Sequence, residues 1–212
     1  MAQNKFKISL RENGEHSFAR GIKAFEEYSR NHDGFLLKDA IIFSHHGIEL
    51  LMKEILVKKS EYLIFEELKE LPKKQIDADR QNIDIFSLER PPRTVSYDIA
   101  LDRVQAFIKP AELDSTLRQS LDQLNRLRNQ IEHYSIEIDR KEVEQILATI
   151  HEPLLKLFEV QIGKLSLLRS SNIDKAWNNI QRSVQDESVK ILEVYDIVRK
   201  FKGQKVIMAL GI

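Results

Sequence analysis

Apolar residues recur along most of the chain at spacings of three and four, which is the period of an α-helix that is buried on one face. Glycine and proline are scarce, with seven and five copies, so few positions interrupt these patterns. We predict an all-α fold, an antiparallel helical bundle. The expected helices cover about 15–30 and 36–59, a stretch from Thr94 or Ser96 to just before Pro110, about 117–133, a long one after Asp139 that includes Leu165, and 171–200.

Between the second and third long helices, the apolar pattern weakens. Residues 60–96 contain Pro72, Pro91 and Pro92 and only short apolar runs. We predict a short helix around Tyr62–Leu71, followed by a long irregular crossover. Acidic and basic side chains alternate there, which favours a solvated loop over a phosphate-binding strip. The chain is interpreted as a single domain over 1–212, with a core of about 15–165, this insertion at about 60–96, and an extra C-terminal helix at about 171–200.

The overall charge excludes a global electrostatic attraction to nucleic acid or membrane. The 33 basic and 33 acidic side chains cancel, so any RNA contact must be local. The absence of cysteine excludes disulfides and thiolate metal sites, and it suits a reducing compartment. No signal-like run or membrane-length apolar stretch is present, so we expect a cytoplasmic protein without membrane contact. The apolar tail KVIMALGI is expected to dock on another surface.

The stretch LRQSLDQLNRLRNQIEHY, residues 117–134, combines a helical apolar register with an unusual polar set. Leucines 117, 121 and 124 define the register, and Ile131 continues it if position 128 faces the core. Position 128 is Arg. Either Leu127 takes over the buried seam, or Arg128 turns inward with a partner, because an unpaired buried guanidinium is costly.

The polar set is Arg128, Asn129, Glu132, His133 and Tyr134. Asn129 and His133 share a helix face, whereas Arg128 and His133 lie about 140° apart on a straight helix. YSIEID and the N-cap residue Asp139 follow, so a helix break just after His133 is expected. The Arg128 and His133 side chains can therefore converge only if the helix loosens near its end or a second copy of the helix completes the site.

The second helix carries a further group, His45, His46 and Glu49. His45 and Glu49 share a face and are suited to act as a base with its partner or as two metal ligands. A metal site usually needs three convergent ligands, and neither His-Glu-x-x-His nor paired Glu-x-x-His motifs are present, so we expect no metal and no cofactor. The alternative is a helix surface, or a core histidine hydrogen-bonded to a backbone carbonyl.

The sequence RNQIEHY resembles the signature of the HEPN superfamily, an Arg, often followed by Asn, with a His four to six residues later. The preceding HHGIELLMKEIL resembles the family's second helix, and TVSYDIALDRV resembles a segment often seen upstream of the motif in bacterial members. The likeness covers about residues 35–158, although the segment between the two helices is longer than compact members need. It implies a HEPN-type bundle that forms a homodimer, with the motifs of two subunits facing each other.

The resemblance also implies an activity, that of a metal-independent endoribonuclease, a hydrolase that cuts RNA by attack of a ribose 2′-hydroxyl on the adjacent phosphate. Arg128 would stabilise charge on the phosphate, and His133 would move a proton near neutral pH. Asn129 would orient His133 or hold a phosphate oxygen, and Tyr134 is a weaker candidate for stacking a base. Glu49 would hold the guanidinium of Arg128 inside the bundle.

The same resemblance suggests a toxin or antiviral defence setting, with an antitoxin or another defence-system protein as a possible partner. In members controlled by a nucleotidyltransferase antitoxin, a spacer residue separates the Tyr from the His, whereas Tyr134 is adjacent to His133. That departure argues against control by tyrosine modification. Two alternatives remain open: a non-catalytic HEPN dimer that binds a nucleotide or acts as a scaffold, and a helical interaction protein in which the match is accidental and Arg128 pairs with Glu132.

Overall fold

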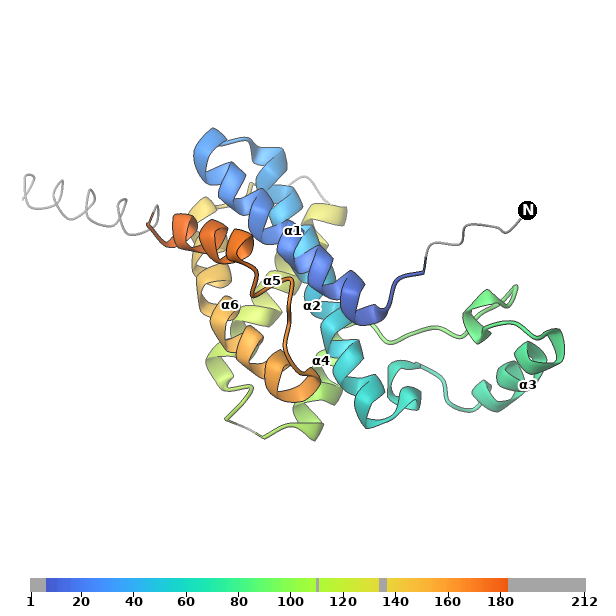
Figure 1. The fold of residues 1–212 in the computed structure, drawn as a ribbon. Coiled ribbons are helices and arrows are strands. Elements are labelled where there is room, and N and C mark those ends of the chain that lie inside the picture. The colour runs from blue at the N-terminus through green and yellow to red at the C-terminus, as the bar shows by residue number, and fades with distance from the viewer. Residues whose placement is uncertain (1–6, 110, 134–136, 183–212) are drawn as a thin grey trace, which may run out of the picture.

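The computed structural model describes residues 7–109, 111–133 and 137–182, and it confirms the all-α prediction. Within these ranges no β-strand occurs, and no helix is both long and apolar enough to cross a membrane. The helices gather into a bundle from which one segment projects (Figure 1). In chain order they are α1 (Leu10–Asn31), α2 (Gly34–Lys59), the 3-10 helix η1 (Glu61–Ile64), α3 (Leu71–Gln81), the 3-10 helix η2 (Ile85–Ser87), α4 (Tyr97–Phe107), α5 (Ser115–His133) and α6 (Arg140–Ile162).

Helix α1 begins five residues earlier than the sequence pattern predicts. Ser9 and Glu12 form a capping box, in which each side chain accepts a hydrogen bond from the backbone of the other. This reciprocal cap satisfies two backbone N–H groups and allows the helix to run through Asn13 and Gly14, a pair that normally favours a turn. Local capping therefore sets the start of α1.

Glycines let α1 and α2 approach closely along their length. A Cβ atom added at Gly47 of α2 would lie 2.4 Å from the backbone nitrogen of Phe18 in α1. A Cβ atom added at Gly21 of α1 would lie 2.3 Å from Oγ of Ser44 in α2. Both distances are far below van der Waals contact, so these two positions require the absence of a side chain.

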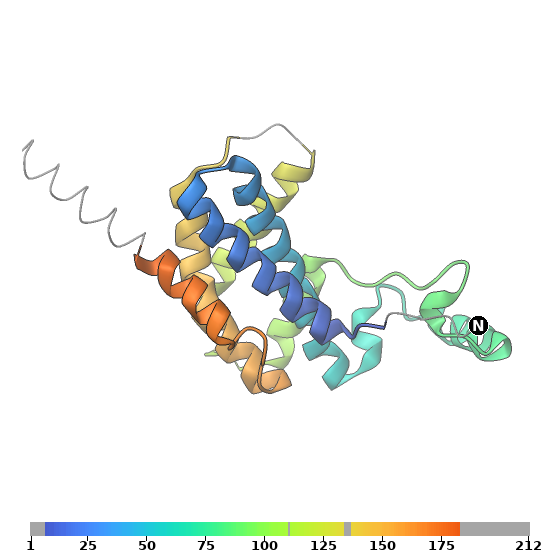
Figure 2. The same ribbon diagram turned by 45° about the horizontal axis from the view of Figure 1, so that its top comes forward.

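Helix α2 is the central element, as its apolar residues on several sides predict. It contacts α1, α4, α5 and α6, which surround it in the bundle (Figures 1 and 2). Its predicted span of 36–59 agrees with the observed Gly34–Lys59 to within two residues. The fully buried side chains of α2 include Ile41, Ile48, Leu51, Met52 and Ile55.

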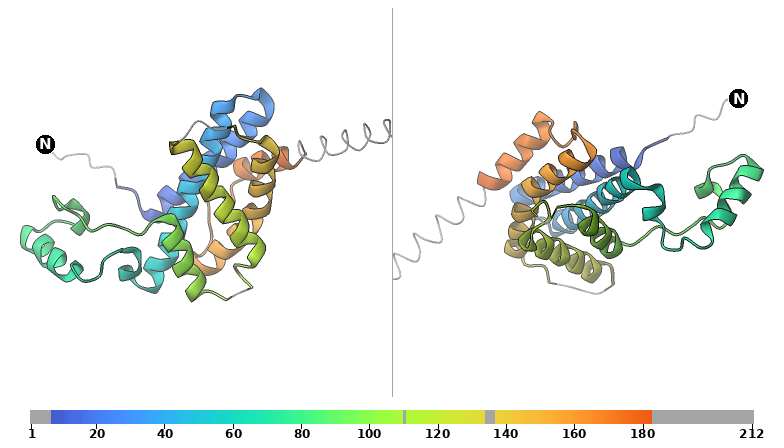
Figure 3. Two further views of the ribbon diagram at one scale, coloured as in Figure 1. Left: turned by 180° about the vertical axis from the view of Figure 1, so that it is seen from behind. Right: turned by 90° about the horizontal axis from the view of Figure 1, so that it is seen from below.

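The insertion differs from the prediction in detail. The helix expected around Tyr62–Leu71 is wrong: that stretch contains only η1, and α3 starts where the predicted helix ends. Pro72 lies in the first turn of α3, where a missing N–H costs nothing and the fixed φ angle favours helix initiation. Residues 66–93, which we call the arm, extend away from the bundle (Figures 1 and 3).

The arm joins the bundle through a short neck. Phe65 and Thr94 form an isolated antiparallel bridge. Arg103 of α4 donates to the carbonyl oxygen of Phe65 at 2.9 Å, and Lys53 of α2 donates to Oγ1 of Thr94 at 3.1 Å. Two cationic side chains from the bundle thus fasten the neck.

The remaining helices follow the predicted boundaries closely. Helix α5 is described as far as His133, and Asp139 caps α6 by accepting from the backbone N–H of Lys141 at 2.8 Å. Helix α6 continues through Pro153 and ends at Ile162, so Leu165 is buried in the following loop instead of in the helix.

The C-terminal helix begins at residue 171, as predicted. Its described part, 171–182, contacts both α1 and α6: Asn179 donates to Glu26 at 2.7 Å, and Trp177 stacks on His151 with ring centroids 3.8 Å apart. Figure 2 shows this segment beside the two helices. The predicted continuation to residue 200 and the tail KVIMALGI lie outside the described residues.

Candidate functional site

Helices α2 and α5 run in opposite directions along a common seam. Phe35, near the start of α2, lines the same hollow as Ile131, near the end of α5. Further along the seam, His45 contacts Asn125. The predicted motif residues therefore occupy the end of α5 that meets the beginning of α2, and Arg128 lies one helical turn beyond Asn125.

The register of α5 resolves the alternatives at position 128. Leu127 is 5% exposed and takes the buried position, together with Leu117, Leu121 and Leu124. The side chain of Arg128 is 31% exposed. The first interpretation from the sequence is confirmed: Leu127 takes over the seam and the guanidinium stays at the surface.

A chain of hydrogen bonds links three helices, running from the buried His45 and Asn125 to the exposed Asp98. The amide nitrogen of Asn125 (α5) donates to Asp98 (α4) at 2.6 Å, so the amide oxygen faces His45 (α2), whose Nε2 lies 2.8 Å away. Because that oxygen only accepts, Nε2 of His45 carries the proton. Tyr97 stacks on the His45 ring, with centroids 4.2 Å apart and planes 20° apart. His45 is thus a core histidine whose partner is a side-chain amide instead of the expected backbone carbonyl.

Burial sets the electrostatic state of this chain. Desolvation lowers the pKa of His45, although the hydrogen bond to Asn125 and the charge of Glu49 act in the opposite direction. Desolvation also raises the pKa of Tyr97, so both aromatic groups favour their neutral forms. Arg128 and Glu132 act on the pKa of His45 through their charges, with opposite signs. The motif therefore lies close enough for its charges to be felt at the buried imidazole.

The ion pair that the resemblance implies between Glu49 and Arg128 is replaced by two others. Glu49 accepts from Lys53, one turn along α2, at 2.7 Å. Arg128 binds Glu132, one turn along α5, at 2.8 Å. Each pair is formed within one helix at i,i+4 spacing, where opposite charges meet without any demand on the packing between helices. Glu49 therefore neutralises the buried Lys53.

Asn129 contacts the guanidinium instead of the imidazole. Its Oδ1 accepts from Nη1 of Arg128 at 2.9 Å. His133 is exposed as the last residue of α5, and His46 is exposed on α2, next to the buried His45. The expected site residue Tyr134 lies outside the described residues.

Four side chains of this region were not among the residues selected from the sequence: Lys53, Tyr97, Asp98 and Asn125. The sequence pattern does point to Asn125, because this residue lies one turn after Leu121 on the buried face of α5, where a side-chain amide needs a hydrogen-bond partner. Tyr97 and Asp98 lie in the TVSYDIALDRV segment that supports the resemblance. No local pattern marks Lys53.

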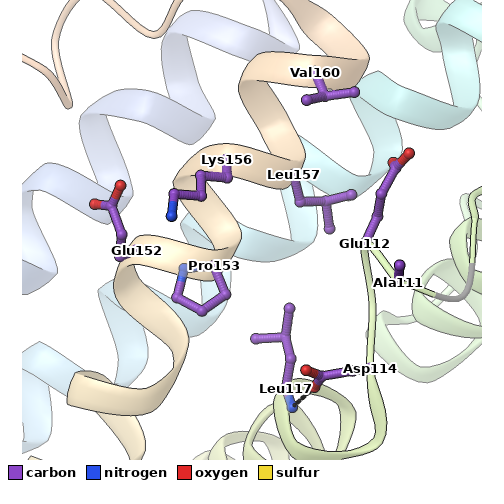
Figure 4. Close-up of a pocket in the computed structure, with 9 residues that line it drawn as sticks. All are labelled: Ala111, Glu112, Asp114, Leu117, Glu152, Pro153, Lys156, Leu157 and Val160. Atoms are coloured by element: carbon purple, nitrogen blue, oxygen red, sulfur yellow. Dashed lines mark hydrogen bonds between the residues drawn. The ribbon is translucent and has the colours of Figure 1, made fainter.

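A separate hollow of about 450 Å³ lies between α6 and the start of α5 (Figure 4). Leu117, Pro153 and Leu157 form much of its apolar wall. Leu117 precedes His133 by 16 residues, about 24 Å along a helix axis, so this hollow is distinct from the motif end of α5. Among the described residues, no group of three or more His, Asp or Glu side chains is arranged to hold a metal ion.

Comparisons with protein-family models, with curated proteins and with solved structures returned no match to this chain.

Proposed function

We propose that this protein is a HEPN-type endoribonuclease that cuts RNA without a metal ion. The observation that carries the proposal is the end of α5, where the guanidinium of Arg128 is partly exposed and the imidazole of His133 is exposed, on a helix that the buried His45–Asn125 contact holds against α2. Arg128 and His133 supply the two functions that this reaction needs, charge stabilisation and proton transfer.

In the proposed reaction, the ribose 2′-oxygen forms a bond to phosphorus while the bond from phosphorus to the 5′-oxygen breaks. The 2′-hydroxyl loses its proton to a base, and the departing 5′-oxygen gains one. His133 serves as base or acid, and Arg128 donates hydrogen bonds to the phosphoryl oxygens. The products carry a 2′,3′-cyclic phosphate and a 5′-hydroxyl.

The contacts of Arg128 are compatible with phosphate binding. Its pair with Glu132 has both side chains about one-third exposed, and such i,i+4 pairs contribute only about 0.3–0.5 kcal/mol. Charge-assisted hydrogen bonds to a phosphate are about twice as strong as neutral ones, and Arg binds phosphate with two parallel donors. A substrate phosphate can therefore displace Glu132 at small cost, while Asn129 continues to hold the guanidinium.

The proposed active form is a homodimer. Arg128 and His133 point about 140° apart on α5, so one helix does not easily direct both at one phosphate. A two-fold axis near the end of α5 would place Arg128 of one subunit opposite His133 of the other. The defence or toxin setting, and an antitoxin or defence partner, belong to the same proposal and rest on the resemblance alone.

The same ion pair favours a second candidate function. Arg128 pairing with Glu132 is the arrangement expected of a helical interaction protein in which the motif has no catalytic role. A non-catalytic HEPN dimer that holds a nucleotide is the other alternative. Both predict an intact fold without RNA cleavage.

The test compares variants of the motif with matched variants beside it. Arg128→Ala and His133→Ala should each remove most cleavage while leaving the helical content and the oligomer mass unchanged. Arg126→Ala on α5 and His46→Ala on α2 change exposed residues of the same types, and both variants should cut like the wild type. A chelator should leave wild-type cleavage unchanged. If neither motif variant affects cleavage, or if wild-type protein cuts no RNA, the nuclease proposal is wrong.

A further inference from the structure

A second hollow, of about 370 Å³, lies where the start of α2 meets the end of α5. Phe35 lines it and is 77% exposed, the most exposed large apolar side chain of the described chain. An aromatic ring at this position does not contribute to the core, because the core of α2 begins at Leu37. Its exposure instead suits the binding of a flat partner. The remaining lining residues are Asp33, Gly34, Lys38, Ile131 and Ile138.

The charges around this hollow favour a phosphate-bearing ligand. Lys38 lies one turn after Phe35, is exposed, and forms no hydrogen bond or ion pair with any other described residue. The other charged lining residue, Asp33, caps α2 by accepting from the backbone N–H of Phe35 at 2.9 Å, and its negative charge is partly offset by the positive end of the helix dipole. The free ammonium group is therefore the cation available at the rim.

The hollow also lies close to the motif. Ile131 follows Arg128 by three residues on α5, which corresponds to about 4.5 Å along the axis and about 60° around it. The guanidinium and the hollow thus occupy neighbouring turns on nearly the same face. A ligand that places a phosphate on Arg128 can place the group next to that phosphate over Phe35.

We propose that Phe35 stacks a nucleobase of single-stranded RNA beside the phosphate that Arg128 holds. This inference rests on the proposed ribonuclease function and adds a subsite to it. Ile131 and Ile138 provide an apolar wall for the base, and Lys38 binds a neighbouring phosphate. The substrate must be single-stranded here, because a base within a duplex has no free face to offer the ring.

The size of the hollow favours a nucleobase as its occupant over a second protein chain. A volume of about 370 Å³ lies in the range of small-ligand sites, about 300–1,000 Å³. A stable dimer interface buries about 800 Å² on each partner, more than one aromatic ring and two isoleucines offer, so the two-fold contact proposed above must use surface beyond this hollow and leave Phe35 open. Together with Lys38 and Arg128, the hollow fits a nucleotide unit better than a protein surface.

The experiment measures binding of a short single-stranded RNA to the full-length His133→Ala protein, which should bind without cutting. Introducing Phe35→Ala into this His133→Ala protein should weaken RNA binding about 5- to 150-fold, the usual effect of removing the aromatic side chain on which one base stacks. Phe35→Trp should retain affinity. Phe107→Ala, which removes a 49% exposed aromatic at the end of α4, should leave affinity unchanged. Lys38→Gln should reduce the salt dependence of binding by about one phosphate contact.

RNAs that carry one abasic nucleotide identify the stacked base. At one position, removing the base should weaken binding as much as Phe35→Ala does, and combining the two changes should add little. Equal affinities for Phe35→Ala and its parent would overturn the inference while leaving any observed wild-type cleavage to support the nuclease proposal. If Phe35 controls binding but wild-type protein cuts nothing, the subsite stands and the nuclease proposal falls. A change in oligomer mass in Phe35→Ala, with RNA affinity unchanged, would assign the hollow to a contact between copies.

Discussion

His45 donates a hydrogen bond through Nε2 to the amide oxygen of Asn125 at 2.8 Å, across the seam between α2 and α5. Both residues are at most 8% exposed. Because Asn125 also donates to Asp98, one side-chain amide connects α2, α4 and α5. This contact fixes the helix that carries the Arg-Asn-x-x-x-His motif against the central helix of the bundle.

Removing the amide should therefore destabilise the fold. Asn125→Ala leaves the buried Nε2–H of His45 without its acceptor, so we expect a loss of about 1–3 kcal/mol in the free energy of unfolding. Urea denaturation, monitored by circular dichroism, measures this loss of stability. Asn129→Ala, one turn further along α5 and partly exposed, is the matched control and should change stability by less than about 0.5 kcal/mol. If both variants changed the free energy of unfolding equally, the His45–Asn125 contact would contribute little to stability.

The contact between α1 and α2 should tolerate no side chain at Gly47. Gly47→Ala places a methyl group against the backbone of Phe18, so we expect destabilisation at or above the upper end of about 1–3 kcal/mol. Gly34→Ala is the control, because a Cβ atom there meets nothing within 4 Å and alanine favours helix. Thermal unfolding should give a lower melting temperature for Gly47→Ala only. A stable Gly47→Ala protein would mean that the two helices can separate without cost.

Stability should fall in mild acid because of His151. Burial lowers its pKa to about 4, while Glu152 and Arg169 act on that pKa with opposite signs, and neither ring nitrogen has a hydrogen-bond partner among the described residues. The unfolded chain, with a histidine pKa of about 6.5, binds a proton that the folded chain does not. The contribution, of the order of 3 kcal/mol, is present above about pH 6.5 and is lost as the pH falls towards 4.

The measurement is urea denaturation at several pH values between 4 and 7. His151→Phe should flatten the profile, because it keeps an aromatic ring against Trp177 and removes the titrating group. His45, whose pKa burial also lowers, accounts for part of the slope that remains. A wild-type profile without any slope in this range would contradict the prediction.

The arm should be the first part of the described chain to be cut by a protease. It is fastened to the bundle at its neck, and α3 buries only Leu71 and Ala78. Limited trypsin digestion should therefore cut at Lys73, Lys74 or Arg80 before any site in α1, α2 or α5, as mass spectrometry of the fragments would show. Arg103→Ala removes the donor to the neck carbonyls and should speed this cleavage. First cuts within the bundle would show that the arm is more stable than its contacts indicate.

The sequence by itself determined the all-α class, the span of α2 and the cap of α6 at Asp139. These features depend on periodicity and capping, which act over a few residues and can be read locally. Where a local signal has two meanings, the prediction failed: Pro72 suggested an interruption, yet it begins α3. The capping box that starts α1 is equally local, and the prediction missed it by beginning the helix at about residue 15.

The tertiary structure alone decided which polar residues meet. His45 and Asn125 are 80 positions apart, and their contact depends on how α2 and α5 rotate and cross, which helical periodicity does not specify. Likewise, only the packing of α5 assigned the seam to Leu127, leaving Arg128 at the surface with Glu132. The sequence named the motif residues because they form one short contiguous pattern, RNQIEHY. Their burial, partners and neighbouring hollow come from helices that fold onto them from elsewhere in the chain.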